Sequence, residues 1–139
     1  MKRQDEEVIP HLALKAIGVV HSSLKTVQDP PPEGQHRLQE AVLEIFPRYC
    51  LGLAGLEKLR RIVVIYWLHQ SEREVLRVYP GGDRNKEMIG VFCNRSPLRP
   101  NPVGIGLVDV LGVNVNRIRV CGLDAVNGTP ILDLKAPSP

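Results

Sequence analysis

Residues 61–70, RIVVIYWLHQ, predict the fold more strongly than any other stretch of the chain. They form a continuous run of β-branched, aromatic and aliphatic side chains, which is typical of a strand buried on both faces. The apolar part, residues 62–68, is far shorter than the ~20 residues that a membrane-spanning helix needs. This stretch therefore predicts a buried strand in a soluble domain.

Strand signals recur on both sides of this stretch. Turn-forming residues separate several of these segments, including residues 80–83 and the Asn127-Gly128 pair. Because strands mostly follow strands, the order of segments favours a mainly β protein, a small β-barrel or strongly bent sheet, over a βαβ array. The further segments with a strand pattern are residues 14–20, 74–80, 88–92, 106–112, 116–122 and 130–134.

Two segments ahead of the buried strand are harder to interpret. Residues 38–46, LQEAVLEIF, fit one face of a helix and also the alternation of a strand, so periodicity leaves both open. Residues 47–59 begin with a proline that suits the first turn of a short helix, although Gly52 and Gly55 weaken that helix. We expect one or two short helices in all.

Length and composition indicate one soluble domain covering residues 1–139, with flexible ends at 1–12 and 136–139. Hydrophobic residues make up 43% and charged residues 24%, which is ordinary for a globular protein. The start, MKRQDEEVIP, is charged and does not resemble a secretory signal. The three cysteines are widely spaced and form no C-x-x-C pair, so we expect no metal site, no disulfide framework and a cytoplasmic location.

The positive charge is concentrated in one part of the sequence. The formal net charge is +3, and residues 1–83 contain eleven basic and eleven acidic side chains. Residues 84–139 contain seven basic and four acidic side chains, so they carry the entire surplus. Such a distribution can attract a phosphate-bearing partner, and it also fits solvated charges on a β surface.

Residues 93–106, CNRSPLRPNPVGIG, form a segment that we call the proline loop. Its three prolines exclude both a helix and a central strand. One interpretation is a stiff turn whose arginines, Arg95 and Arg99, are solvated. The other is a pre-ordered binding loop whose guanidinium groups meet a carboxylate or a phosphate.

Other candidate motifs are weak. Gly104-Ile105-Gly106 is the one glycine pair that resembles a dinucleotide fingerprint, and the helix that should follow it is missing, which argues against a Rossmann fold. His69 ends the buried strand, where a histidine serves either as a structural residue or as part of a site at a barrel mouth. The serines lie in no nucleophile elbow, so the sequence does not favour a hydrolase.

The proline loop and its surroundings resemble the TsaA-like family. GVFCNRSPLRPNPVGIGLVDVLG at residues 90–112 and VCGLDAVNGTPILDLK at residues 120–135 are similar to the family's characteristic motifs. AIGVVHSSLKT at residues 16–26 and the block at residues 46–71 extend the resemblance. It implies a small β-barrel homodimer, not a Rossmann methyltransferase, that uses S-adenosylmethionine to methylate N6 of threonylcarbamoyladenosine beside the tRNA anticodon. It also implies that residues 38–46 are a strand.

The same resemblance implies a set of site residues. The implied S-adenosylmethionine contacts are Gly34, Gln35, His69, Gln70, Arg95, Ile105, Asp124, Ala125, Val126 and Asn127. The candidate RNA-binding residues are Arg99, Asn101 and Lys135. No catalytic residue is assigned, and Asp124 is expected either to face the cationic cofactor or to cap the Asn127-Gly128 turn.

The chain departs from the family pattern at several positions. Cys93-Asn94 replaces an Ala-Thr pair, Asn127 stands where aspartate is usual, and the arginine of a P-R-Q segment is absent at residues 33–35. The chain also ends in KAPSP instead of KPY and a tail. Two alternatives to the tRNA methyltransferase therefore stay open: a methyltransferase of the same fold with another substrate, and a non-enzymatic barrel that binds S-adenosylmethionine or RNA.

Overall fold

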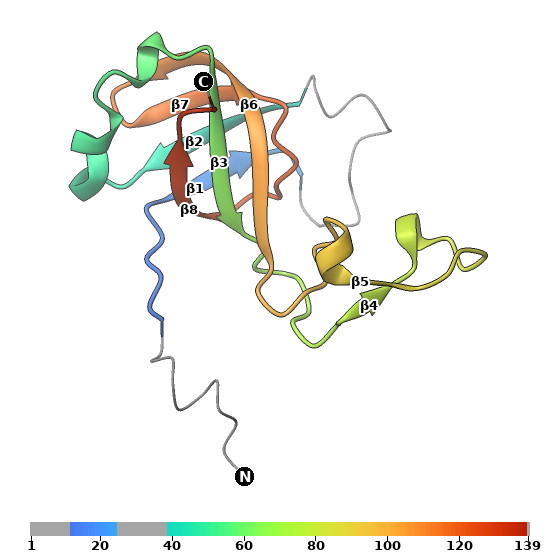
Figure 1. The fold of residues 1–139 in the computed structure, drawn as a ribbon. Coiled ribbons are helices and arrows are strands. Elements are labelled where there is room, and N and C mark those ends of the chain that lie inside the picture. The colour runs from blue at the N-terminus through green and yellow to red at the C-terminus, as the bar shows by residue number, and fades with distance from the viewer. Residues whose placement is uncertain (1–11, 25–38, 139) are drawn as a thin grey trace.

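The structure, a computed structural model, describes residues 12–24 and 39–138. Six antiparallel strands close into a barrel in the order β1-β2-β7-β6-β3-β8 (Figure 1). The strands are β1 (Gly18–Ser22), β2 (Glu40–Ile45), β3 (Arg61–Trp67), β6 (Val103–Asn114), β7 (Arg117–Cys121) and β8 (Pro130–Lys135). The prediction of a mainly β barrel without a Rossmann fold is confirmed.

The inward side chains of the strands fill the barrel. Along β3 the side chains of Ile62, Val64 and Tyr66 are buried, and those of Val63, Ile65 and Trp67 between them are only partly buried. The expectation that this strand is buried on both faces is therefore wrong. A closed barrel has one interior, and no helix of the described residues packs over the outside of β3.

Two predictions about local structure change in detail. Residues 40–45 form β2, as the resemblance implied, and pair with β1 and β7. Residues 47–59 are not one helix but two 3₁₀ segments, η2 (Pro47–Leu53) and η3 (Leu56–Lys58). Gly55 separates them with φ of 89°, a conformation that glycine adopts without a steric penalty. The expected strand at residues 14–20 begins only at Gly18.

Residues 75–92 form an arm beside the barrel (Figure 1). The predicted strands at 74–80 and 88–92 shrink here to β4 (Arg77–Val78) and β5 (Ile89–Gly90), which pair only with each other. Two further 3₁₀ turns, η4 (Pro80–Gly82) and η5 (Val91–Cys93), complete the arm and lead into the proline loop. No helix in the described part of the chain is long and apolar enough to cross a membrane.

Candidate functional site

A cavity of about 580 Å³, the main cavity, opens at one end of the barrel. It forms because β7 pairs with β6 only from Asp109 onward, whereas β3 pairs with β6 from Val103. The first half of β6 therefore borders open space on the side away from β3. Residues 93–102 of the proline loop, the end of β3 and the connection from β7 to β8 enclose this space. Residues 103–106 belong to β6, so the expectation that the whole proline loop excludes a central strand is wrong for them.

Tyr66 closes the inner side of the main cavity. Its side chain is 6% exposed, and its hydroxyl donates a hydrogen bond to the main-chain oxygen of Asp124 at 3.4 Å. Burial, with the Asp124 carboxylate adding to it against the opposing effect of Arg95, raises the pKa of Tyr66 to about 12. The phenol is therefore protonated near neutral pH and acts as a hydrogen-bond donor.

The absence of a side chain at Gly104 leaves space for the Tyr66 ring. A Cβ atom at residue 104 would collide with the Cε2 and Cζ atoms of that ring, because Gly104 pairs with Tyr66 across the β3–β6 ladder. Gly106, two residues further on, also lines the cavity. The pair of glycines that looked like a weak dinucleotide motif thus keeps this stretch of β6 free of side chains on the inner face.

The two arginines of the proline loop have different roles. The Arg99 guanidinium donates to the main-chain oxygens of Val91 at 2.6 Å, Ser96 at 3.2 Å and Asn94 at 3.4 Å, and so holds the loop together from inside. Arg95 is exposed, and its Nη2 donates to the oxygen of Ile105 at 3.0 Å. The interpretation in which both arginines are solvated is therefore wrong for Arg99.

Short turns add to the order of the loop. The Asn94 side-chain oxygen accepts from the Ser96 amide at 3.0 Å, and the Ser96 hydroxyl accepts from the Leu98 amide at 3.1 Å. Outside the loop, Arg73 donates from Nε to the Pro100 oxygen at 2.8 Å and from Nη2 to the Asn101 side-chain oxygen at 3.1 Å. The loop is thus fixed by side chains on both of its sides.

The structure brings six of the ten implied cofactor residues to the main cavity. These are His69, Gln70, Arg95, Ile105, Asp124 and Val126, and the candidate RNA-binding residue Arg99 also lines it. Gly34 and Gln35 lie outside the described residues.

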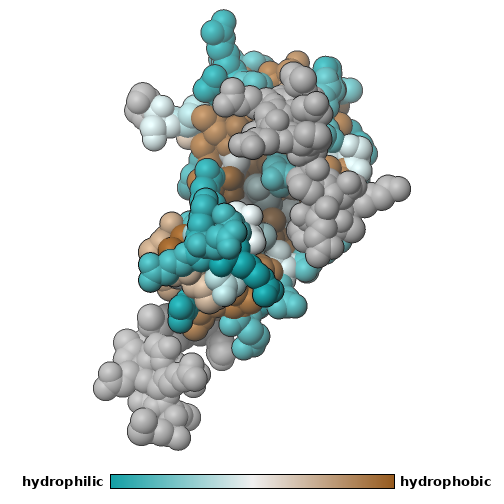
Figure 2. All heavy atoms as spheres, turned by 90° about the vertical axis from the view of Figure 1, so that its right-hand side faces the viewer, coloured by the Kyte–Doolittle hydropathy of each residue, from teal (hydrophilic) through white to brown (hydrophobic). Residues whose placement is uncertain are grey.

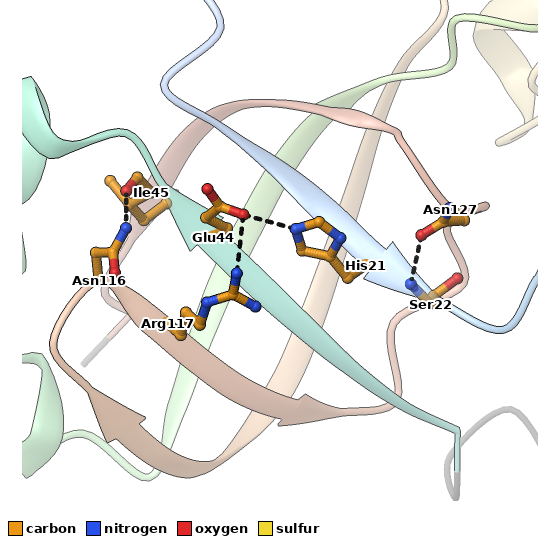
Figure 3. Close-up of polar contacts among 7 residues, drawn as sticks. All are labelled: His21, Ser22, Glu44, Ile45, Asn116, Arg117 and Asn127. Carbon is orange, nitrogen blue, oxygen red and sulfur yellow. Dashed lines mark hydrogen bonds and ion pairs between the residues drawn. The ribbon is translucent and has the colours of Figure 1, made fainter.

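Ala125 and Asn127 do not line the cavity but hold its wall in place. The Ala125 oxygen accepts from the Ser22 hydroxyl at 2.9 Å, and the Asn127 side-chain oxygen accepts from the Ser22 amide at 3.0 Å (Figure 3). The β7–β8 connection is thereby tied to the end of β1. The close-up also shows Glu44 between His21 and Arg117. Glu44 pairs with His21 at 2.8 Å and with Arg117 at 3.4 Å, and none of the three residues lines the main cavity.

Two candidate RNA-binding residues lie apart from the cavity. Asn101 is exposed on the loop, with its side chain engaged by Arg73. Lys135 forms an ion pair with Asp133 at 3.2 Å and pairs in register with Val63, four residues along β3 from Trp67. That spacing corresponds to ~13 Å along a strand, so Lys135 lies toward the other end of the barrel.

Sequence reasoning missed several residues of the main cavity. Tyr66 belongs to the apolar run at residues 62–68, and this run does not indicate which of its side chains point inward. Leu24, Leu68 and Thr129 lie in or beside turns, and only the closed barrel brings them together. The further lining residues, none of which was among the candidate site residues, are Leu24, Tyr66, Leu68, Pro97, Val103, Gly104, Gly106, Leu107, Gly122 and Thr129.

The lining is suited to a ligand that carries charges of both signs and an apolar part. The guanidinium group of Arg95 can meet a carboxylate, and the carboxylate of Asp124 can meet a cation. Leu24, Leu68 and Val126 supply apolar surface. No group of three His, Cys, Asp or Glu side chains that could hold a metal ion occurs among residues 12–24 and 39–138.

The chain is similar in sequence to proteins of one known family. The sequence model of the tRNA-methyltransferase O N-terminal domain matches residues 19–139. An S-adenosyl-L-methionine-binding protein of Archaeoglobus fulgidus is 46% identical over 130 residues, which cover 92% of this chain and 91% of that protein. A probable S-adenosyl-L-methionine-binding protein of Methanothermobacter thermautotrophicus is 46% identical over 124 residues, 89% of this chain and 88% of that one.

The fold is also found in solved structures. A crystal structure of TrmO from Pseudomonas aeruginosa matches with a TM-score of 0.74 and 26% sequence identity. The match covers 95% of the present chain and 58% of the TrmO chain. The present chain therefore spans little more than half the length of that protein.

Proposed function

Because the chain belongs to the family of the tRNA-methyltransferase O N-terminal domain, as its motifs indicated, we propose that it binds S-adenosylmethionine in the main cavity and methylates tRNA. The nucleoside in this proposal is threonylcarbamoyladenosine beside the anticodon, with N6 as the acceptor. One observation carries the proposal: six residues that the motifs associate with the cofactor, from four separate segments, line a single cavity.

The residues around the cavity fit this cofactor. The volume of about 580 Å³ lies in the ordinary range for small-molecule pockets. Asp124 and Arg95 line the cavity, where in this proposal the Asp124 carboxylate balances a sulfonium or ammonium charge and Arg95 binds a carboxylate. The two archaeal relatives are named as proteins that bind S-adenosyl-L-methionine, which supports the same assignment.

When bound, S-adenosylmethionine supplies an electrophilic methyl group on its sulfonium. The protein then has to hold the acceptor nitrogen in line with that methyl group, and such alignment can contribute ~7–11 kcal/mol toward the barrier. The proline loop suits this task because Arg99 and Arg73 fix it from both sides. Tyr66, protonated near neutral pH, serves as a donor and not as a base. We assign no general base.

Two measurements test the proposal. Calorimetric titration with S-adenosylmethionine should show binding, and single-turnover assays should show methyl transfer to tRNA that carries threonylcarbamoyladenosine but not to tRNA that lacks it. Failure to bind the cofactor would overturn the proposal. Binding without methyl transfer to any tRNA would indicate the non-enzymatic barrel, and equal transfer to both tRNAs would indicate another substrate.

We also propose that the active form is a homodimer. Uncovered strand edges give this assembly little support, because the six strands close into a barrel in which only the first half of β6 lacks a neighbour on one side. Support comes instead from the outer face of β6, where Ile105 and Leu107 are each 52% exposed beside the partly buried Val63 and Ile65. Sedimentation as a monomer at micromolar concentration would contradict this proposal.

A further inference from the structure

A second cavity, of about 680 Å³, runs between the arm and the proline loop, and we call it the arm groove. The arm supplies one side through β4 and the η4 turn, and the proline loop supplies the other. Figure 2 shows hydrophilic residues gathered on the part of the arm nearest the viewer, with apolar residues beside them. The lining residues that matter here are Arg77, Tyr79, Arg84, Met88, Arg95 and Leu98.

The lining of the arm groove carries positive charge. Three guanidinium groups line it, from Arg77, Arg84 and Arg95, and no carboxylate does. Neither Arg77 nor Arg84 forms an ion pair with a carboxylate among residues 12–24 and 39–138. A lining of this kind favours an anion, and guanidinium groups match the geometry of phosphate well.

Arginines on the barrel wall behave differently. Arg61 pairs with Asp109 at 3.3 Å, Arg117 with Glu44 at 3.4 Å, and Arg119 with Glu40 at 3.9 Å. Charge on the wall is therefore balanced locally, and charge in the groove is not. On the arm, the Asp83 carboxylate accepts from the Asn85 amide at 2.9 Å and is not among the residues that line the groove.

The groove also offers flat, apolar surface. The Tyr79 ring is partly buried, and Arg84 Cζ lies 5.9 Å from its centroid. Met88 and Leu98 add apolar contacts. Gly81 and Gly82, with φ of 62° and 75°, form the turn without projecting side chains into the groove. Aromatic rings and guanidinium planes are the surfaces on which unpaired RNA bases stack.

The two cavities meet at the proline loop. Arg95 and Pro97 line both of them, so a strand held in the arm groove lies directly beside the main cavity. We propose that the arm groove binds one unpaired nucleotide of the RNA substrate next to the nucleotide that is methylated. Arg77 and Arg84 contact its phosphates, and its base stacks on Tyr79. This inference rests on the proposed function, because it assumes an RNA substrate.

The test measures RNA binding separately from methyl transfer. The probe is a fluorescently labelled anticodon stem-loop RNA, and its dissociation constant is measured by anisotropy over a range of salt concentrations. Tyr79→Ala should weaken binding by about five- to a hundredfold, as expected for the loss of one stacked base, and Tyr79→Phe should restore it. Arg77→Ala with Arg84→Ala should also make the salt dependence shallower, by about one unit of slope for each lost phosphate contact.

The matched control is the double variant Arg117→Ala with Arg119→Ala, which removes the same charge from the barrel wall. It should change the affinity and the salt slope much less than the groove variant does. All variants should keep their affinity for S-adenosylmethionine and their melting temperature. Equal effects of the wall and groove variants, or equal affinity of the wild type for a fully paired RNA duplex, would overturn the groove assignment.

The outcomes also separate this inference from the proposed function. Methylation by the wild type with unchanged RNA binding in the groove variants would overturn the groove alone. RNA binding that depends on Tyr79, with no methyl transfer, would overturn the proposed function and retain the groove. A wild type that does not bind the stem-loop RNA at all would overturn both.

Discussion

The Tyr66 hydroxyl donates to the main-chain oxygen of Asp124 at 3.4 Å, and this contact joins β3 to the β7–β8 connection across the main cavity. Tyr66 belongs to the barrel core, and Asp124 belongs to a turn that the sequence motifs associate with a ligand. One phenol thus links the stability of the barrel to the shape of the site. Its buried position has a consequence that can be measured by titration.

We expect Tyr66 to titrate at about pH 12. Because this lies above the ~10 of an unfolded tyrosine, the related stabilisation is complete below about pH 10 and is lost as the pH rises through about 12. The loss should be on the order of 2 kcal/mol. Absorbance of tyrosinate should show a late step that Tyr66→Phe removes. Loss of a step near pH 10 instead of the late step in Tyr66→Phe would contradict the expected pKa.

We expect alanine substitutions at the two arginines of the proline loop to have different effects, one on cofactor affinity and the other on stability. Arg95→Ala should weaken S-adenosylmethionine binding by ~1–3 kcal/mol and leave the melting temperature nearly unchanged, since Arg95 makes one exposed hydrogen bond. Arg99→Ala should lower the melting temperature, because it leaves several loop carbonyls without a donor. Calorimetry and thermal unfolding of both variants check this. If only Arg99→Ala weakens cofactor binding, the assignment is reversed.

Adding a single methyl group at residue 104 should affect both stability and cofactor binding. Gly104→Ala places a Cβ against the Tyr66 ring, and overpacking of this kind costs ~1–3 kcal/mol. We expect a lower melting temperature and weaker cofactor binding. Gly112→Ala on the same strand is the control, because its Cβ would come no closer than 3.8 Å to Arg119. Similar effects of the two substitutions would argue against the steric explanation.

We expect Asn127 to stabilise the protein through its hydrogen bond with the Ser22 amide. Asn127→Ala should destabilise the protein by about 1 kcal/mol, because the Ser22 amide loses its acceptor. Asn127→Asp keeps an acceptor oxygen, so it should retain more stability than the alanine variant. Chemical denaturation of the three proteins gives the comparison. Direct binding of the cofactor by Asn127 would appear instead as lost affinity without lost stability.

The sequence predicted the elements of the barrel better than it predicted their surroundings. Alternation in residues 116–122 identified β7, one face of which packs into the core, and the Asn127-Gly128 turn ahead of residues 130–134 indicated β8. The arm was predicted as two longer strands, although β4 and β5 pair only with each other outside the closed barrel. The strand propensity of a segment does not indicate whether a neighbouring strand is present for it to pair with.

Motifs located the main cavity through a minority of its lining residues, and local patterns could not have done so. Ser22 and Asn127 meet although they are 105 residues apart, a contact that no local pattern can indicate. Tyr66 was missed because a run of apolar residues does not show which side chains face inward. Arg99 could be placed inside the loop only once the carbonyls of Val91 and Ser96 were seen to converge on it.

Replacing Pro100 and Pro102 by alanine should lower turnover more than it lowers stability. Both main-chain oxygens already accept hydrogen bonds, from Arg73 at 2.8 Å and from the Leu68 amide at 2.7 Å, and alanine keeps these acceptors. The main effect is then greater backbone freedom, which costs ~0.4–1 kcal/mol for each site through the unfolded chain. Methyl transfer tolerates little misalignment, so a loop that samples more conformations should slow it disproportionately.

The test compares melting temperature, S-adenosylmethionine affinity and single-turnover methylation in the double proline variant. Pro130→Ala at the start of β8 is the control, because it removes a proline away from the loop. We expect the loop variant to keep its cofactor affinity within a small factor and to lose most of its single-turnover rate. Unchanged turnover in a folded loop variant would show that Arg99 and Arg73 alone hold the loop in position and that the prolines only end the strand pairing.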